Sequence, residues 1–224
     1  MIFKDREEAG RELGRALEAY RGPNSIVLGI PRGGVAVGYE VARELGAPLD
    51  AIVVRKIPVP WNPEAGFGAV GPDGTVTINE EIMPYLALSS KAIDRLAAEV
   101  YEEVRRRMRV YRGDRPEAPL TGRVALVVDD GLATGVTMVA ALRSARNQGA
   151  DKVIAASPVA SGAGVKLIQP DADEVVCLYT HPEEYPFAVA AFYRQWTDMT
   201  DAEVIDYLSR PTSGPSIPGR ESAS

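Results

Sequence analysis

Two adjacent carboxylates, Asp129 and Asp130, stand between an apolar run and a loop rich in glycine and threonine. The run, 124–128, has the Val-Ala-Leu-Val-Val composition of a strand that is buried on both faces of a parallel sheet. After the loop, 131–137, small and apolar residues predict a helix that ends at Gly149. This order of elements directs the backbone N–H groups of the loop to one point at the helix N-terminus. The stretch therefore predicts an anion-binding loop beside two acidic side chains.

The side chains of this stretch suit a phosphorylated sugar. The hydroxyls of Thr134 and Thr137 can donate to phosphate oxygens, and the glycines let a ligand approach the backbone closely. The two carboxylates would repel a phosphate, so we expect them to face the hydroxyls of a vicinal diol. Val136 stands where a nucleotide-triphosphate P-loop needs its lysine, and no expected strand is followed by Gly-x-Gly-x-x-Gly. The sequence thus argues against triphosphate and dinucleotide binding.

A second strand, glycine turn and helix come earlier in the chain. Apolar residues 25–30 lead into the turn Pro31-Arg-Gly-Gly34 and then into a predicted helix over 35–45. The Arg32 side chain and the free N–H groups of the turn can bind another anionic group. In open α/β sheets the loops at the carboxyl ends of adjacent strands border one ligand crevice. We therefore expect this turn and the loop 131–137 to share a ligand.

The stretch Val127-Val-Asp-Asp-Gly-Leu-Ala-Thr-Gly-Val-Thr-Met138 resembles the phosphoribosyl pyrophosphate (PRPP) signature of type I phosphoribosyltransferases, especially the adenine phosphoribosyltransferase form. The resemblance implies that the acidic pair holds the ribose 2′- and 3′-hydroxyls and that the loop after it holds the 5′-phosphate. It makes the turn 31–34 the pyrophosphate loop. It also matches Arg55 and Lys56, which follow the apolar run 49–54, to a basic pair that reaches pyrophosphate oxygens.

The implied PRPP-binding residues are Arg32, Gly33, Gly34, Asp129, Asp130, Gly131, Leu132, Ala133, Thr134, Gly135, Val136 and Thr137. The implied catalytic residues are Arg55, Lys56 and Asp130. The cofactor would be Mg²⁺, which Asp129 and Asp130 would reach only through the ribose hydroxyls or water. In the aromatic-rich region 183–196, Phe187 and Trp196 are the candidates to contact the acceptor.

The sequence departs from the family in two places. Ala133 stands where hypoxanthine-type members carry a further Asp, which argues against a hypoxanthine-type mechanism. Related enzymes close a mobile loop over the reacting sugar, some with a catalytic Lys, but no Lys or Arg occurs between Lys56 and Lys91. The Pro- and Gly-rich segment 57–68 is therefore expected to be a long lid loop that brings no cation.

The remaining patterns complete an α/β fold. Helices are expected over 5–20, 90–111 and 162–168, a hairpin over 67–78, further strands over 152–159 and 174–179, and a last helix opened by a Thr200–Glu203 capping box. Together they predict a Rossmann-like, mainly parallel sheet of about five strands flanked by helices, with a small hood and a flexible loop. We expect one domain over 1–210, with its core at about 25–180 and a hood from the N- and C-terminal segments. The composition of 211–224 predicts a disordered tail.

Composition narrows the function. The net charge of −6 argues against a nucleic-acid surface, and the arginines at 105, 106, 107 and 109 have Glu99, Glu102 and Glu103 alongside, so a solvated or dimer-facing helix is expected. One cysteine and one histidine exclude an intrachain disulfide and a multi-His metal site. No apolar run reaches membrane-spanning length and the N-terminus lacks a signal-peptide layout, which predicts a cytoplasmic protein without membrane partners.

The favoured hypothesis is a phosphoribosyltransferase, a pentosyl-type glycosyltransferase of nucleotide metabolism. It would move the 5-phosphoribosyl group of Mg-PRPP to a nitrogenous acceptor such as a nucleobase, release pyrophosphate and act as a homodimer. The alternative is a non-catalytic PRPP- or nucleotide-binding regulatory protein. A hydrolase of phosphorylated sugars lacks a recognisable nucleophile. The sequence does not identify the acceptor.

Overall fold

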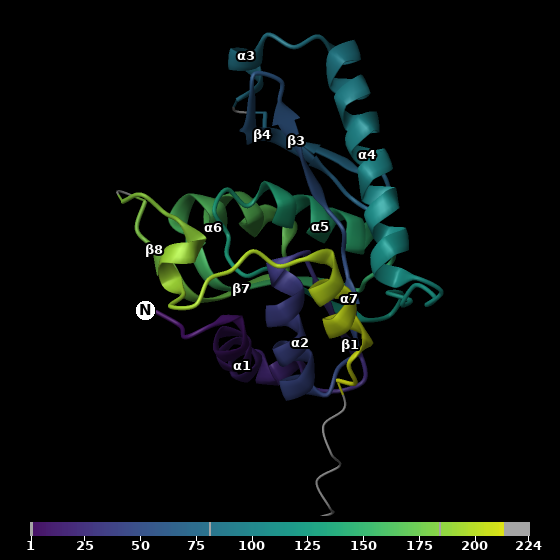
Figure 1. Cartoon of the computed structure of the whole chain (residues 1–224), viewed down its shortest axis with the longest axis vertical. Coiled ribbons are helices and arrows are strands. Elements are labelled where there is room, and N and C mark those ends of the chain that lie inside the picture. The colour runs from purple at the N-terminus through teal and green to yellow at the C-terminus, as the bar shows by residue number, and fades with distance from the viewer. Residues whose placement is uncertain (1, 81, 184, 213–224) are drawn as a thin grey trace, which may run out of the picture.

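The computed structural model describes residues 2–80, 82–183 and 185–212 and is built on a five-stranded sheet (Figure 1). Its strands are in the order β2-β1-β6-β7-β8, and every neighbouring pair is parallel. The strands are β1 (Ser25–Gly29), β2 (Leu49–Ala51), β6 (Val124–Val128), β7 (Lys152–Ser161) and β8 (Glu174–His181). The predicted parallel sheet of about five strands is confirmed.

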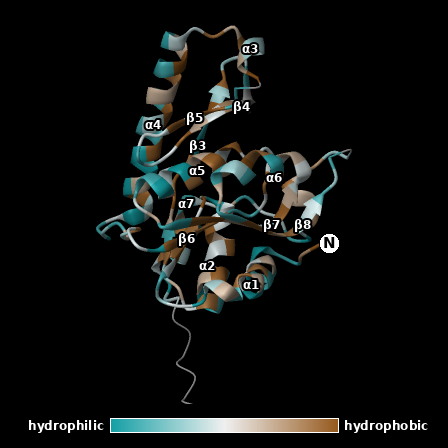
Figure 2. Cartoon of the chain, turned by 180° about the vertical axis from the view of Figure 1, so that it is seen from behind, coloured by the Kyte–Doolittle hydropathy of each residue, from teal (hydrophilic) through white to brown (hydrophobic). Residues whose placement is uncertain are grey.

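Helices cover both faces of this sheet. One face packs on α1 (Arg6–Ala16) and α2 (Gly33–Leu45), and the other packs on α5 (Val136–Asn147) and α6 (Gly162–Ile168). In Figure 1 the first pair lies below the sheet and the second above it, and in Figure 2 the strands between them are the most hydrophobic part of the ribbon. The apolar runs therefore form strands because both of their faces are buried.

The predicted start of α1 and the predicted end of α2 agree with the structure. Asp5 caps α1 by accepting the backbone N–H of Glu8, and Gly46 ends α2 in the left-handed conformation that glycine tolerates best. The first helix is shorter than expected, because a turn at Leu17 separates it from the 3₁₀-helix η1 (Glu18–Tyr20).

A second sheet stands on top of the α5 layer in Figure 1. It is antiparallel, in the order β3-β4-β5, with β3 (Arg55–Val59), β4 (Asn62–Val70) and β5 (Val76–Ile78). Two helices complete this unit, the short α3 (Met83–Leu86) and the long α4 (Ser90–Arg112). The predicted hairpin over 67–78 and the long charged helix are both confirmed.

The expected lid loop over 57–68 is wrong, because most of this segment is the β3–β4 hairpin. Ile57, Val59 and Phe67 bury their side chains under α4, so tertiary packing overrides the loop-like composition. The register shifts on either side of Pro58, which cannot donate a ladder hydrogen bond. Arg55 and Lys56 consequently begin an antiparallel strand, and they do not end a strand of the parallel sheet.

The chain then returns along the carboxyl ends of the parallel strands to the N-terminus. Beyond the 3₁₀-helix η2 (Gln169–Asp171) and β8, residues 182–200 include the 3₁₀-helix η3 (Val189–Phe192). The Phe3 N–H donates to the Phe192 carbonyl at 2.8 Å, and the Arg194 N–H donates to the Phe3 carbonyl at 2.9 Å. The two ends of the domain are thereby joined beside the site.

The last helix, α7 (Asp201–Ser209), packs between α2 and α4 through Val204 and Leu208. Its Thr200–Glu203 capping box is confirmed. The expected tail over 211–224 lies outside the described residues except for 211 and 212. Among the helices that the structure describes, none is both long enough and apolar enough to cross a membrane.

Candidate active site

The turn 31–34 and the segment 128–131 touch at one edge of the parallel sheet. Their strands, β1 and β6, are parallel neighbours, so both loops leave the sheet on the same side. A Cβ atom added to Gly33 would overlap the carboxylate of Asp130, and one added to Gly34 would lie 2.5 Å from the Val128 carbonyl oxygen. The two glycines therefore serve a close approach between the loops, and the predicted juxtaposition of these loops is observed. The Pro31–Arg32 peptide bond in the turn is cis.

Asp129 is the inner member of the acidic pair. Its carboxylate accepts the backbone N–H of Asp130 at 2.9 Å. Burial, together with the negative charge of Asp130, raises the pKa of Asp129 well above its usual value. A hydrogen-bond donor brought to this carboxylate would relieve that unfavourable environment, which suits a sugar hydroxyl and excludes a phosphate.

Asp130 is paired with Arg6, a residue that sequence analysis assigned only to a structural helix. The Arg6 Nε donates to an Asp130 carboxylate oxygen at 2.8 Å, and the two side chains are only 11% and 15% exposed. The Arg6 guanidinium lies 3.9 Å from the centre of the Trp196 ring and donates to the Thr197 carbonyl at 2.9 Å. These partners are 124 and 191 positions away in the chain, so no local pattern could have marked Arg6.

The C-terminal segment covers the acidic pair. The Tyr193 hydroxyl donates to the Asp130 carbonyl at 2.6 Å, and a Cβ on Gly131 would overlap the side chain of Val189. Burial, followed by the charge of Asp130, raises the pKa of Tyr193 far above its usual value, so this hydroxyl is a fixed donor. The segment 189–193 thus packs against the start of the loop 131–137.

The two candidate acceptor residues have different surroundings. Phe187 packs in an aromatic cluster, with ring centres 5.8 Å from His181 and 5.3 Å from Phe192. Trp196 lies against Tyr193 at 5.2 Å and carries the Arg6 guanidinium on its ring. The Trp196 ring is therefore already in contact with Arg6. Phe187 lies at the carboxyl end of β8, in the same hydrophobic cluster as Val189.

The loop 131–137 is fixed by contacts to β7. Leu132 and Val136 bury their side chains in the core, and the Leu132 carbonyl accepts the Ser161 N–H at 2.8 Å. The Leu132 N–H donates to Val159, and the Ser161 hydroxyl donates to the Ala133 carbonyl at 2.6 Å. Gly135 caps α5 with a φ of 78°, a left-handed conformation. Thr134 is exposed and Thr137 is half-buried, and Thr137 lines the cavity described next.

A cavity of about 570 Å³ lies beside these loops, between the parallel sheet and α4. Arg55 and Lys56 line it together with Pro31 of the glycine turn and Thr137 of the loop 131–137. The wall formed by α4 adds Glu99 and Glu103. Burial, and next the nearby charge of Arg107, lowers the pKa of Arg55. Two of the cations predicted from sequence, Arg55 and Lys56, therefore line this cavity, and they reach it from the second sheet, whereas Arg32 is not among its lining residues.

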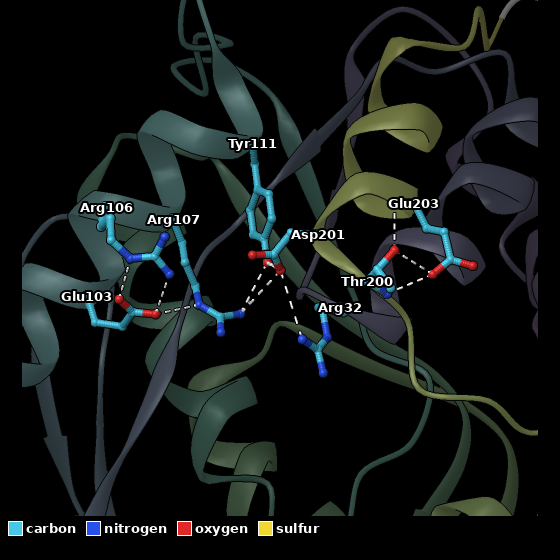
Figure 3. A network of polar contacts seen from close by, with 8 residues as sticks. All are labelled: Arg32, Glu103, Arg106, Arg107, Tyr111, Thr200, Asp201 and Glu203. Atoms are coloured by element: carbon cyan, nitrogen blue, oxygen red, sulfur yellow. Dashed lines mark hydrogen bonds and ion pairs between the residues drawn. The ribbon is translucent and has the colours of Figure 1, made fainter.

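Figure 3 shows a polar network that joins α4, α7 and the glycine turn. The Tyr111 hydroxyl donates to the Asp201 carboxylate at 2.7 Å, and guanidinium nitrogens of Arg107 and Arg32 each lie 3.9 Å from the same carboxylate. Glu103 accepts from Arg106 at 2.7 Å and from Arg107 at 2.8 Å. The hydrogen bonds from these two arginines lower the pKa of Glu103 to about 2.

Metal ligands are sparse in the protein itself. Within residues 2–80, 82–183 and 185–212, no three His, Cys, Asp or Glu side chains gather in a way that could hold a metal ion. Asp129 and Asp130 are two adjacent carboxylates, and Asp130 already contacts Arg6.

Comparison with known proteins identifies one domain. Residues 88–190 match the family model of the phosphoribosyl transferase domain. Two Mycobacterium tuberculosis proteins, from strains CDC 1551 / Oshkosh and ATCC 25618 / H37Rv and each named "Putative phosphoribosyl transferase", are 46% identical over 209 residues, or 93% of this chain. The chain covers 47% of each, so it spans about half the length of these curated relatives.

A solved structure extends the similarity to the whole fold. The crystal structure of TT1426 from Thermus thermophilus is 41% identical to this chain, with a TM-score of 0.77. The similarity covers 93% of this chain and 98% of TT1426. Both sheets therefore lie within a chain segment that the two proteins share.

Proposed function

From the match of residues 88–190 to the phosphoribosyl transferase domain, we propose that the chain is a type I phosphoribosyltransferase, which transfers the 5-phosphoribosyl group of PRPP to a nitrogenous acceptor and releases pyrophosphate. The observation that carries the proposal is that the acidic pair contacts the glycine turn, and that Pro31 of the same turn lines a cavity together with Arg55 and Lys56. PRPP has the complementary shape, since a neutral diol separates its 5′-phosphate from its pyrophosphate.

The acidic pair would bind the ribose. Asp129 and Asp130 accept hydrogen bonds from the 2′- and 3′-hydroxyls, and the amides of 133–137 with the two threonine hydroxyls hold the 5′-phosphate. Because a carboxylate can accept several hydrogen bonds, the Arg6 contact leaves Asp130 able to bind the sugar while fixing its orientation. Arg6 is thereby proposed as a positioning residue for the acidic pair.

The cations would bind the leaving group. Breaking the anomeric C–O bond builds positive charge on the ribose ring and negative charge on the pyrophosphate. Arg55 and Lys56, which line the cavity, and Arg32 of the glycine turn would face the pyrophosphate, and the carboxylate of Asp130 beside Gly33 would face the sugar. Charges placed in advance where the reaction develops opposite charge are usually the largest catalytic contribution. When bound, Mg²⁺ would neutralise part of the pyrophosphate charge.

The acceptor is proposed to stack near Phe187. This ring lies at the carboxyl end of β8 in the cluster that reaches Val189 and hence Gly131. Trp196 is a weaker candidate because its ring carries Arg6. A planar nitrogen heterocycle, as in a nucleobase, fits an aromatic contact of this kind.

A second candidate function is a PRPP sensor without turnover. The observation in its favour is that no Lys or Arg occurs from residue 57 to residue 90, so the β3–β4 hairpin beyond Lys56 brings no cation to the reacting sugar. The enzyme is favoured because Arg55 and Lys56 already line the cavity.

One experiment separates these functions. PRPP is titrated into the protein with and without Mg²⁺, and pyrophosphate release is then measured across purines, pyrimidines and related heterocycles. Acceptor-dependent release is expected and would identify the substrate class. Binding without release for any acceptor would favour the sensor, and absence of binding would refute both.

A further inference from the structure

The arginines of α4 divide into outer and inner members. Arg106 is 51% exposed, and its guanidinium donates two hydrogen bonds to Glu103. Arg107 is 17% exposed and has Glu103, Tyr111 and Asp201 around its guanidinium. Adjacent positions on the same helix thus place one cation in solvent and the next, largely buried, against Tyr111 and Asp201.

Arg107 is close enough to the proposed pyrophosphate residues to act with them. Its charge is the second cause, after burial, of the lowered pKa of Arg55. Arg107 and Arg32 approach the Asp201 carboxylate from two sides, each at 3.9 Å (Figure 3). Arg107 of α4 therefore acts electrostatically on Arg55 of β3 and shares the Asp201 carboxylate with Arg32 of the glycine turn. An anion bound among these guanidinium groups would reduce their mutual repulsion.

The charge balance leaves room for such an anion. The cations Arg32, Arg55, Lys56, Arg106 and Arg107 outnumber the carboxylates Glu103 and Asp201 that lie among them. Glu99, which also lines the cavity, lies 3.7 Å from Arg95 and is balanced separately. This excess of positive charge suits a diphosphate group.

Asp201 is held loosely by its cations. Its short contact is the 2.7 Å hydrogen bond from the Tyr111 hydroxyl, whereas both arginines are at 3.9 Å. Charge-assisted hydrogen bonds between guanidinium and carboxylate or phosphate are usually about 2.7–2.9 Å. A phosphate could therefore take over the two guanidinium groups while Asp201 keeps its bond to Tyr111.

We propose that Arg107 is a further pyrophosphate-binding residue and that Asp201 is an internal anion which holds Arg107 and Arg32 ready until the ligand displaces it. This inference rests on the proposed function, because it assigns new residues to the same ligand. On binding, the guanidinium of Arg107 turns from Asp201 to pyrophosphate oxygens, and no covalent bond of the protein changes.

The test compares Arg107→Ala with Arg106→Ala in the full chain. Both variants remove one cation from the same helix and one partner from Glu103, so general charge and helix effects match. Titration with inorganic pyrophosphate and with PRPP should give binding about tenfold or more weaker for Arg107→Ala, in line with the loss of a hydrogen bond to a charged group. Arg106→Ala should stay within about twofold of the wild type, and Arg107→Lys should recover part of the loss.

Thermal unfolding of each variant tests a purely structural role. If Arg107→Ala does not fold, Arg107→Gln replaces it, because the amide can still donate to Glu103. Equal affinities for the Arg107 and Arg106 variants would overturn the inference while leaving the proposed function intact. A wild-type protein that binds neither pyrophosphate nor PRPP would overturn both.

Asp201→Asn tests the displaced anion. Asparagine keeps an acceptor for the Tyr111 hydroxyl but removes the negative charge, so pyrophosphate should bind several-fold more tightly. Asp206→Asn, in the same helix and paired with Arg210, is the matched control and should leave the affinity unchanged. Weaker binding in Asp201→Asn would overturn the role of Asp201 as a displaced anion.

Discussion

The acidic and cationic halves of the site differ in how far the protein itself satisfies them. Asp130 is already paired with Arg6, and the C-terminal segment is fixed over the acidic pair by Tyr193. The cationic half adjoins a cavity of about 570 Å³, and Arg32 and Arg107 lie 3.9 Å from Asp201, although Arg107 is also hydrogen-bonded to Glu103 at 2.8 Å. We infer that the acidic half contributes shape and stereochemistry, while the cationic half contributes most of the attraction for a charged ligand.

The largest expected effect separates the two halves. Asp130→Asn, or Asp129→Asn, should abolish PRPP binding without unfolding the protein, because an amide replaces an acceptor of the ribose hydroxyls. Inorganic pyrophosphate should still bind, since its contacts lie in the other half. Calorimetric titration with both ligands measures the difference, and circular dichroism monitors folding. Normal PRPP affinity in either variant would refute the assignment of the acidic pair.

A substitution at the boundary should damage both halves at once. In Gly33→Ala the new methyl group would overlap the Asp130 carboxylate, so the turn and the acidic pair must move apart. We expect weaker binding of PRPP and of pyrophosphate, and a loss of stability of about 1–3 kcal/mol, as for overpacking. Gly38→Ala is the control in α2, because its nearest atom outside its own helix would be 3.3 Å away. Equal melting temperatures for the two variants would contradict the close approach of the loops.

Changes within the cationic half should weaken both ligands together. Arg55→Ala or Lys56→Ala removes one charge from the cavity wall, and we expect pyrophosphate and PRPP to lose affinity by a similar factor, roughly tenfold. The effect should decrease at high ionic strength, because Lys56 is exposed. Lys91→Ala, at an exposed position in the first turn of α4, is the control. A loss for PRPP alone would mean that these cations do not contact the pyrophosphate group.

The smallest expected effect concerns stability and pH. Because the folded protein raises the pKa of Asp129, the stability linked to this group is fully present below the unfolded pKa of about 3.9 and is lost as pH rises through the folded pKa. Asp129→Asn should therefore raise the melting temperature at pH 7, and the gain should shrink toward pH 4. Thermal scans from pH 4 to 8 without added metal test this. A variant less stable than the wild type across that range would contradict it.

The parts of the site formed by consecutive residues could be predicted from sequence. Strand β6, the acidic pair and the loop 131–137 form one local pattern, and so do β1 and the turn 31–34, because each strand passes directly into a phosphate-binding type of loop. Parallel pairing of β1 with β6 then brings the two loops together without further information.

The parts formed by distant residues could not be predicted. Arg6, Arg107 and Asp201 matter only because α1, α4 and α7 pack beside the sheet, and nothing in their neighbours along the chain marks them. The prediction of a lid loop over 57–68 was wrong for another reason. The Pro and Gly content of this segment is typical of a loop, but the segment forms a hairpin with side chains buried under α4. In both cases tertiary packing decides the outcome.

The most direct measurement is a titration of the wild-type protein with PRPP, with inorganic pyrophosphate and with ribose 5-phosphate, each in the presence of Mg²⁺. If the two halves form one site, PRPP should bind with a stoichiometry of one, more tightly than either fragment, and both fragments should compete with it. PRPP that binds no more tightly than pyrophosphate, or a ribose 5-phosphate that fails to compete, would show that the acidic and cationic halves do not serve one ligand.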